Sequence, residues 1–91
     1  MSNLPTILRR AAATCDRDPT CCAHIAINDA THEHHDLYRP ALEAFAQAAG
    51  VTLDPPHAEC NGLRPLHRWW DAASVGGRKI FDQAIADTGA A

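Results

Sequence analysis

The sequence predicts an all-α protein, a small bundle of four to five short helices with one long loop and no sheet. Apolar residues recur at helical spacing in five segments. Prolines open most of these segments, and glycines lie near the ends of several, as is typical of helix starts and stops. No segment alternates apolar and polar residues with period two, and β-branched residues are sparse, so no strand is expected.

The first two helices are predicted in the N-terminal third of the chain. The first covers residues 5–14, and its apolar face is formed by Leu4, Ile7, Leu8, Ala11 and Cys15. The second begins with Asp18 as N-cap and Pro19 as its first residue, and it extends to residues 35–38. Its predicted buried stripe consists of Cys22, Ile25, Ala26 and Ala30.

The third helix is predicted over residues 40–50, where Pro40 starts it and Gly50 ends it. Its apolar face is formed by Leu42, Phe45, Ala46 and Ala49. Pro40 either kinks one long helix or separates two, and the sequence leaves both alternatives open. Residues 51–64 form a long connection rich in Asp, Pro, Asn and Gly. A loop of that length is often functional or held in place by another group.

Two further helices are predicted over residues 65–74 and 78–88, separated by a Gly-Gly break. The former contains the apolar residues Leu66, Trp69, Trp70 and Ala73, and the latter faces inward with Ile80, Phe81, Ala84 and Ile85. A chain of this length is expected to form one domain over residues 1–91. Because Ala supplies 18 of the 42 apolar residues, the core is small, and a dimer interface, a metal or a crosslink would supplement it.

The charge pattern argues against several classes of function. The net charge is −3, and the seven Arg and one Lys are scattered rather than gathered in a basic stripe, so direct nucleic-acid binding is not favoured. The N-terminal segment lacks the apolar stretch of a signal peptide, and no apolar run reaches the length of a membrane span. We therefore expect a cytoplasmic protein whose thiols stay reduced.

Ten of the 91 residues are Cys or His, and one pattern among them indicates a metal site. Cys21 and His24 are separated by two residues, and so are His57 and Cys60. Two thiolates and two imidazoles form a normal tetrahedral zinc shell, so one zinc ion would pin the long loop to the second helix. In the alternative, Cys21 and Cys22 pack as small apolar residues, His24 is exposed and no cofactor is bound.

A second group of histidines follows in residues 31–36. On a helix, His24, Asn28, His32 and either His35 or Asp36 lie along one stripe. His32 and Asp36, four residues apart, can chelate a divalent ion. In the alternative, these residues form a solvated polar face that responds to pH near six.

Disulfide and catalytic chemistry have less support. The four cysteines can pair in three ways, but no Cys-x-x-Cys redox motif occurs. The sequence also lacks a phosphate-binding loop, a nucleophile elbow and a clear Cys–His–acid order. We therefore predict that the protein is not an enzyme.

Residues 64–71 combine arginines with two adjacent tryptophans. Adjacent tryptophans cannot share one helical face, so one is expected in the core and the other at its edge or on the surface. Trp and Arg are enriched at interface hot spots, which makes Arg68, Trp69 and Trp70 a candidate protein-binding anchor. In the alternative, both tryptophans partly cover an Ala-rich core.

Together these observations predict a small protein-interaction module: an inhibitor, adaptor or immunity-type protein that binds and occludes another protein, with a homodimer as one arrangement. Arg68→Ala and Trp70→Ala are expected to lose the partner while staying folded. The alternative from another class is a transition-metal protein that uses the Cys and His ligands above. A weaker alternative is a DNA-associated regulator that uses the last two helices, whose binding would weaken steeply with salt.

Overall fold

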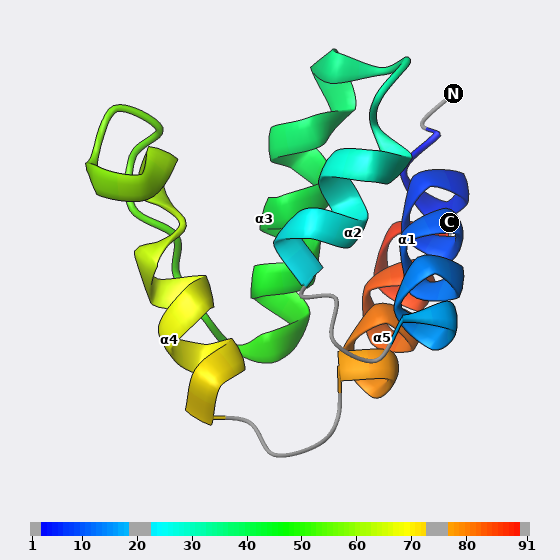
Figure 1. The fold of residues 1–91 in the computed structure, drawn as a ribbon. Helices are drawn as coiled ribbons and strands as arrows, with labels where there is room; N and C mark the ends of the chain where they lie inside the picture. Colours follow the sequence, from blue (N-terminus) through cyan, green and yellow to red (C-terminus); the bar gives the residue numbers. More distant parts are fainter. Residues whose placement is uncertain (1–2, 19–22, 73–76, 90–91) are drawn as a thin grey trace.

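The computed structural model describes residues 3–18, 23–72 and 77–89. Over these ranges the helices are α1 (Leu4–Arg17), α2 (Ala23–Ala30), α3 (Tyr38–Ala49), α4 (Arg64–Ala72) and α5 (Gly77–Gly89). Two short 3₁₀ turns, η1 (His35–Leu37) and η2 (Glu59–Gly62), precede α3 and α4. The described ranges contain no strand (Figure 1), and the all-α prediction is confirmed. No helix in these ranges has the length and apolar character needed to cross a membrane.

Four helices form the main body of the bundle. α1 packs between α2 and α5, and α3 packs against α5 on the opposite side (Figure 1). The buried core residues are Ile7, Leu8, Ala11, Ala12, Ala23, Ala26, Ile27, Ala41, Leu42, Phe45, Leu63, Leu66, Phe81 and Ala84. Six of these fourteen are alanines, so the predicted Ala-rich core is confirmed, and the small side chains let the helices approach closely.

Phe45 lies at the centre of this core and is fully buried. Its ring centroid is 4.7 Å from that of Phe81 on α5, 5.8 Å from Trp69 and 6.2 Å from Trp70 on α4. These tilted and edge-on arrangements are the ones that aromatic quadrupoles favour. Phe45 therefore joins α4 to the α3–α5 pair through side-chain packing.

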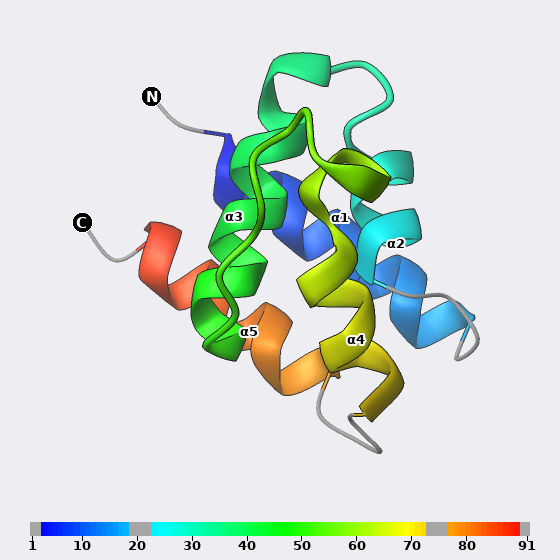
Figure 2. The same cartoon turned by 90° about the vertical axis from the view of Figure 1, so that its left-hand side faces the viewer.

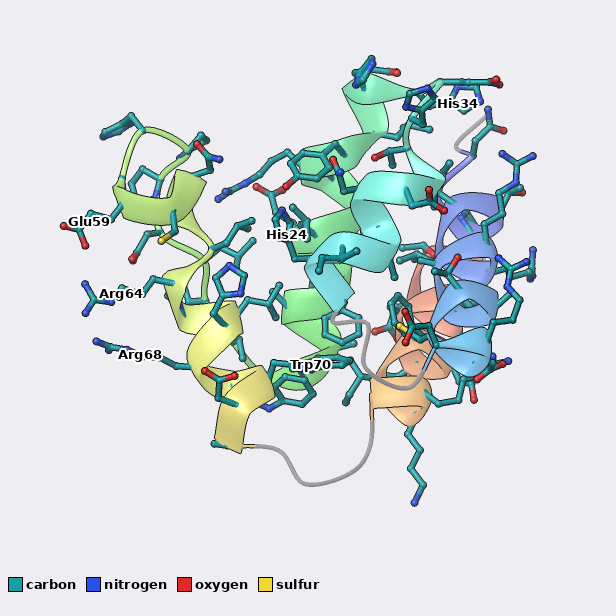
Figure 3. All side chains as sticks on the ribbon, in the orientation of Figure 1. His24, His34, Glu59, Arg64, Arg68 and Trp70 are labelled. Carbon is teal, nitrogen blue, oxygen red and sulfur yellow. The ribbon has the colours of Figure 1, made fainter. Side chains whose placement is uncertain are left out.

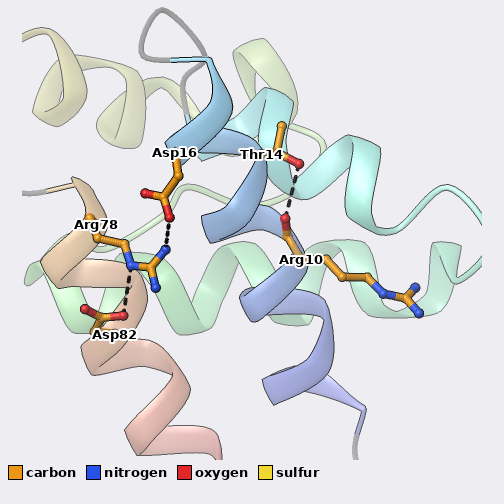
Figure 4. A network of polar contacts seen from close by, with 5 residues as sticks. All are labelled: Arg10, Thr14, Asp16, Arg78 and Asp82. Atoms are coloured by element: carbon orange, nitrogen blue, oxygen red, sulfur yellow. Dashed lines mark hydrogen bonds and ion pairs between the residues drawn. The ribbon is translucent and has the colours of Figure 1, made fainter.

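Arg78 of α5 links the exposed sides of α1 and α5. Its guanidinium pairs with Asp16 of α1 and donates to Oδ1 of Asp82 at 3.1 Å, while Thr14 donates to the carbonyl of Arg10 (Figure 4). All three charged side chains are about half exposed or more. Because exposed ion pairs contribute little, we attribute the α1–α5 contact to the apolar core.

The prediction for α2 was wrong about which isoleucine is buried. Ile25 is 56% exposed, whereas Ile27 is fully buried with Ala23 and Ala26. The two isoleucines lie two residues apart, about 200° around a helix, so only one can face the core. Among the described residues of α2, the buried positions are 23, 26 and 27, with Ala30 partly buried against the core. Cys22 and Pro19 lie outside the described residues.

α2 also ends earlier than predicted, at Ala30. The hydroxyl of buried Thr31 donates to the carbonyls of Ile27 at 2.8 Å and Asn28 at 3.3 Å. The N–H of His32 donates to the carbonyl of Asp29 at 3.3 Å, so the Thr31 hydroxyl takes the place of a helical donor at Asn28. α3 then begins at Tyr38, and Pro40 lies in its first turn, where a missing N–H leaves no hydrogen bond unmade. Pro40 thus belongs to the start of a separate helix and does not kink a longer one.

Arg39 holds the long loop against α3. Its Nη2 donates to the carbonyl of Asp54 at 2.7 Å, its Nη1 donates to the carbonyl of Asn61 at 3.0 Å, and its Nε donates to Glu43 at 3.1 Å. Figure 2 shows the loop running along α3 before the chain turns back into α4. The two loop carbonyls lie 15 and 22 residues from Arg39, so one guanidinium fork fixes both sides of the loop.

Gly62 closes the same loop. Its carbonyl accepts the N–H of Asp54 at 3.0 Å, and its φ is +80°. A Cβ at this position would lie 2.2 Å from the carbonyl oxygen of Asp54 and 2.6 Å from that of Pro55. Only glycine fits between these backbone atoms, and the close approach brings the chain to Leu63 and Leu66 in the core.

We predict that Gly62→Ala lowers the free energy of unfolding by at least about 2 kcal/mol more than Gly50→Ala does. Both glycines have left-handed backbone angles, but a Cβ at Gly50 meets nothing within 4 Å. Gly50→Ala therefore carries only the backbone penalty, about 1 kcal/mol, and the difference isolates the clash at Gly62. Chemical denaturation of both variants measures it, and equal losses would show that the loop does not need this close approach.

Candidate functional site

α4 presents two chemically different faces. Leu66 is buried, and Trp69 and Trp70 are half-buried against the core. Arg64 and Arg68 are exposed, and Figure 3 shows both pointing away from the bundle while Trp70 points toward it. The helix is therefore held by its apolar side and offers a polar, basic side to solvent.

The two tryptophans both cover the core, as one of the two alternatives from the sequence predicted. Both are half-buried, both contact Phe45, and their own ring centroids are 6.1 Å apart. The side of α4 that faces the core lies between the two tryptophans, so each is partly buried and partly exposed. Trp70→Ala would remove packing around Phe45, so it would perturb the core and is not the clean binding probe that the sequence suggested.

Arg68 differs from its neighbour one turn earlier. Nη1 of Arg64 donates to the carboxylate of Glu59 at 2.8 Å. Within the described ranges, the side chain of Arg68 has neither a hydrogen bond nor an ion pair. The outer face of α4 thus carries one neutralised arginine and one arginine whose donors all face solvent.

A second group of side chains lies at the inner junction of three helices. The ring of His24 on α2 is 5.5 Å from that of His67 on α4 and 6.0 Å from that of Tyr38 at the start of α3, measured between centroids. The two imidazoles are nearly perpendicular, at 84°. Residues 43 positions apart in the sequence therefore face each other across the α2–α4 junction.

The environment of this junction favours neutral side chains. Burial lowers the pKa of His24, and the nearby positive form of His67 lowers that pKa further. Burial raises the pKa of Tyr38, with the charge of Arg39 opposing the shift more weakly. At neutral pH the junction therefore contains an uncharged imidazole and an uncharged phenol.

Sequence reasoning missed the pairing of His24 with His67, although a signal for part of it was present. His67 follows the same 63, 66, 67, 70 spacing as the residues by which α4 contacts the core, so its inward position could have been predicted. Which histidine it would meet depends on the path of the long loop. That path is set by Arg39 and Gly62 and not by a local pattern.

The predicted zinc ligands are not brought together over the part of the chain that the structure describes. There, no group of three or more His, Cys, Asp or Glu side chains is placed to hold a metal ion, so His24, His57 and Cys60 do not share a site. His57 and Cys60 are exposed on the loop. Cys21 lies outside the described residues, and the four-ligand set stays a prediction. The loop-pinning role assigned to zinc is performed by Arg39.

The second predicted metal face is divided by the early end of α2. His32, His35 and Asp36 are exposed, and the rings of His32 and His35 are 6.4 Å apart in the turns after Ala30. His32 also lines a surface depression of about 450 Å³ between α1 and this segment, where arginines and carboxylates both occur. The prediction placed these residues on one helical stripe with His24, and it is wrong because α2 ends at Ala30.

Comparisons of this chain with protein-family models, with curated proteins and with solved structures find no match.

We predict that His24 makes stability depend on pH below neutrality. Because its folded-state pKa lies below the ordinary value of 6.5, the unfolded chain binds the proton more readily. The contribution of neutral His24 is complete above pH 6.5 and is lost as pH falls below it. Denaturation at pH 7.5 and 5.5 should show a smaller loss for His24→Gln than for the wild type, with exposed His57→Gln matching the wild type. Identical losses for wild type and His24→Gln would contradict this assignment.

Proposed function

We propose that the protein is a small helical protein-binding module that acts by occluding a surface of its partner. The contact surface is the outer face of α4, defined here as Arg64, Arg68 and Asp71 together with the exposed edges of Trp69 and Trp70. An inhibitor, an adaptor or an immunity-type protein would act in this way.

The observation that carries the proposal is the state of Arg68. It is exposed on a helix whose opposite side is anchored, and among the described residues nothing neutralises it. It lies beside two half-exposed tryptophans. Tryptophan and arginine are both enriched at interface hot spots. A cation flanked by aromatic edges fits a partner surface that offers a carboxylate beside apolar groups.

The charges around Arg68 favour a protein partner over a nucleic acid. Glu59 already pairs with Arg64, and Asp71 is exposed one turn after Arg68. A phosphate backbone would be repelled by these carboxylates, whereas a protein surface can meet both signs. The DNA-associated alternative predicts salt-sensitive binding to a duplex and is tested separately by that measurement.

The support for α4 also suits a binding surface. The helix is held from one side by Phe45 and at its beginning by the loop that Arg39 clamps. A rigid helix loses little conformational freedom on binding, so more of the contact energy contributes to affinity.

We predict that Arg68→Glu weakens partner binding about tenfold or more, since a like-charge contact replaces an attractive one. The partner would first be captured by crosslinking with the wild-type chain, and its affinity would then be measured with purified components. Arg9→Glu is the matched control, because Arg9 is exposed on α1, away from α4 (Figure 1), and the change in net charge is the same. Equal affinities of the wild type and Arg68→Glu, or equal losses in both variants, would contradict the assignment of this face.

A further inference from the structure

The docking surface on α4 does not use the imidazoles of His24 and His67 on its inner side. We propose that these two histidines form a binding site for a divalent transition-metal ion, which links α2 to α4. The site is independent of the outer face of α4 and differs from the predicted zinc set, because it uses His67 in place of the loop residues His57 and Cys60.

The distance between the rings fits a shared ion. With a metal–nitrogen distance of about 2.0–2.1 Å, a metal lies roughly 3.2 Å from the centroid of an imidazole that ligates it. Two imidazoles on one ion at an angle of about 109–120° then have centroids about 5.2–5.5 Å apart. The observed separation of His24 and His67 is 5.5 Å. The separation of the two rings therefore matches the one that a shared ion requires.

The nitrogens of both rings are available. Over the described ranges, no hydrogen bond involves the side chain of His24 or His67, and the ring of His24 lies against the rings of His67 and Tyr38. Half-burial at a junction of three helices also limits the motion of the side chains, so less freedom is lost on binding.

The ligand chemistry identifies the class of ion. Imidazole nitrogen suits Zn²⁺, Ni²⁺ and Cu²⁺, and affinities of such sites increase from Ni²⁺ to Cu²⁺. Two protein ligands leave the remaining coordination positions to water. Because His24 and His67 come from different helices, the ion binds the folded chain and would stabilise the docked position of α4.

The test is titration of the untagged full chain with NiCl₂ at pH 7.5, followed by calorimetry and by the thermal unfolding midpoint. We expect about one ion per chain and a raised midpoint. His24→Gln and His67→Gln should each weaken binding by at least about tenfold, because a second ligand fixed in place binds as an intramolecular one. His57→Gln and His32→Gln are the matched controls and should bind as the wild type does.

A second readout keeps the proposal testable if a glutamine variant unfolds. Ni²⁺ is paramagnetic and should selectively broaden the NMR signals of the His24 and His67 rings in the wild-type chain. Broadening centred on His57, or on His32 and His35, would overturn the proposal, as would the absence of binding. Neither readout involves a protein partner, so failure here leaves the proposed docking surface untouched.

Discussion

The hydrogen bonds from Arg39 to the carbonyls of Asp54 and Asn61 are the interaction on which the position of α4 depends. In the loop before α4, Leu53 packs against the core at one end and Leu63 is buried at the other, and most of the residues between them are exposed. The guanidinium of Arg39 on α3 fixes both sides of the loop. Gly62 lets the two sides approach closely enough for the N–H of Asp54 to donate to the Gly62 carbonyl. With the loop held in this way, Trp69 and Trp70 of α4 are positioned to pack against Phe45.

The position of α4 in turn creates two surfaces from one helix. On the inner side His67 meets His24, and on the outer side Arg68 faces solvent. Both depend on the same contact between the tryptophans and Phe45, so any ligand that binds one side only when α4 is docked also favours the other. The coupling would be reciprocal, since each ligand shifts the same docking equilibrium. A small Ala-rich bundle can therefore combine a structural link and a binding face without a second domain.

Local patterns predicted the elements, and long-range contacts decided the rest. Gly50 and Pro40 mark helix ends as expected, and Phe45 and Phe81 are core residues as the spacing indicated. The choice of Ile27 over Ile25 could not be made, because the apolar pattern of so short a helix fits either face. The sequence indicated that the long loop is held in place by another group, but it did not indicate which group holds it. The acceptors are backbone carbonyls, which every residue carries, so nothing in the sequence connects Arg39 to Asn61. For the same reason, the His24–His67 pair was missed. Arg68 was chosen as a candidate for its residue type beside two tryptophans, and the structure places it on the exposed side of α4.

The most direct test of this account is urea unfolding of Arg39→Ala and Arg39→Lys, followed by tryptophan fluorescence and far-UV circular dichroism on the same samples. Trp69 and Trp70 are the only tryptophans of the chain, so fluorescence reports on the docking of α4, whereas circular dichroism reports on all helices. For the wild type we expect coincident transitions. For both variants the fluorescence transition should move to lower urea and precede the loss of helix, with the free energy of α4 undocking reduced by about 1–2 kcal/mol. Lysine should not rescue it, because lysine restores the charge but not the two-pronged guanidinium geometry. Coincident transitions at the wild-type midpoint in both variants would show that Arg39 does not position α4.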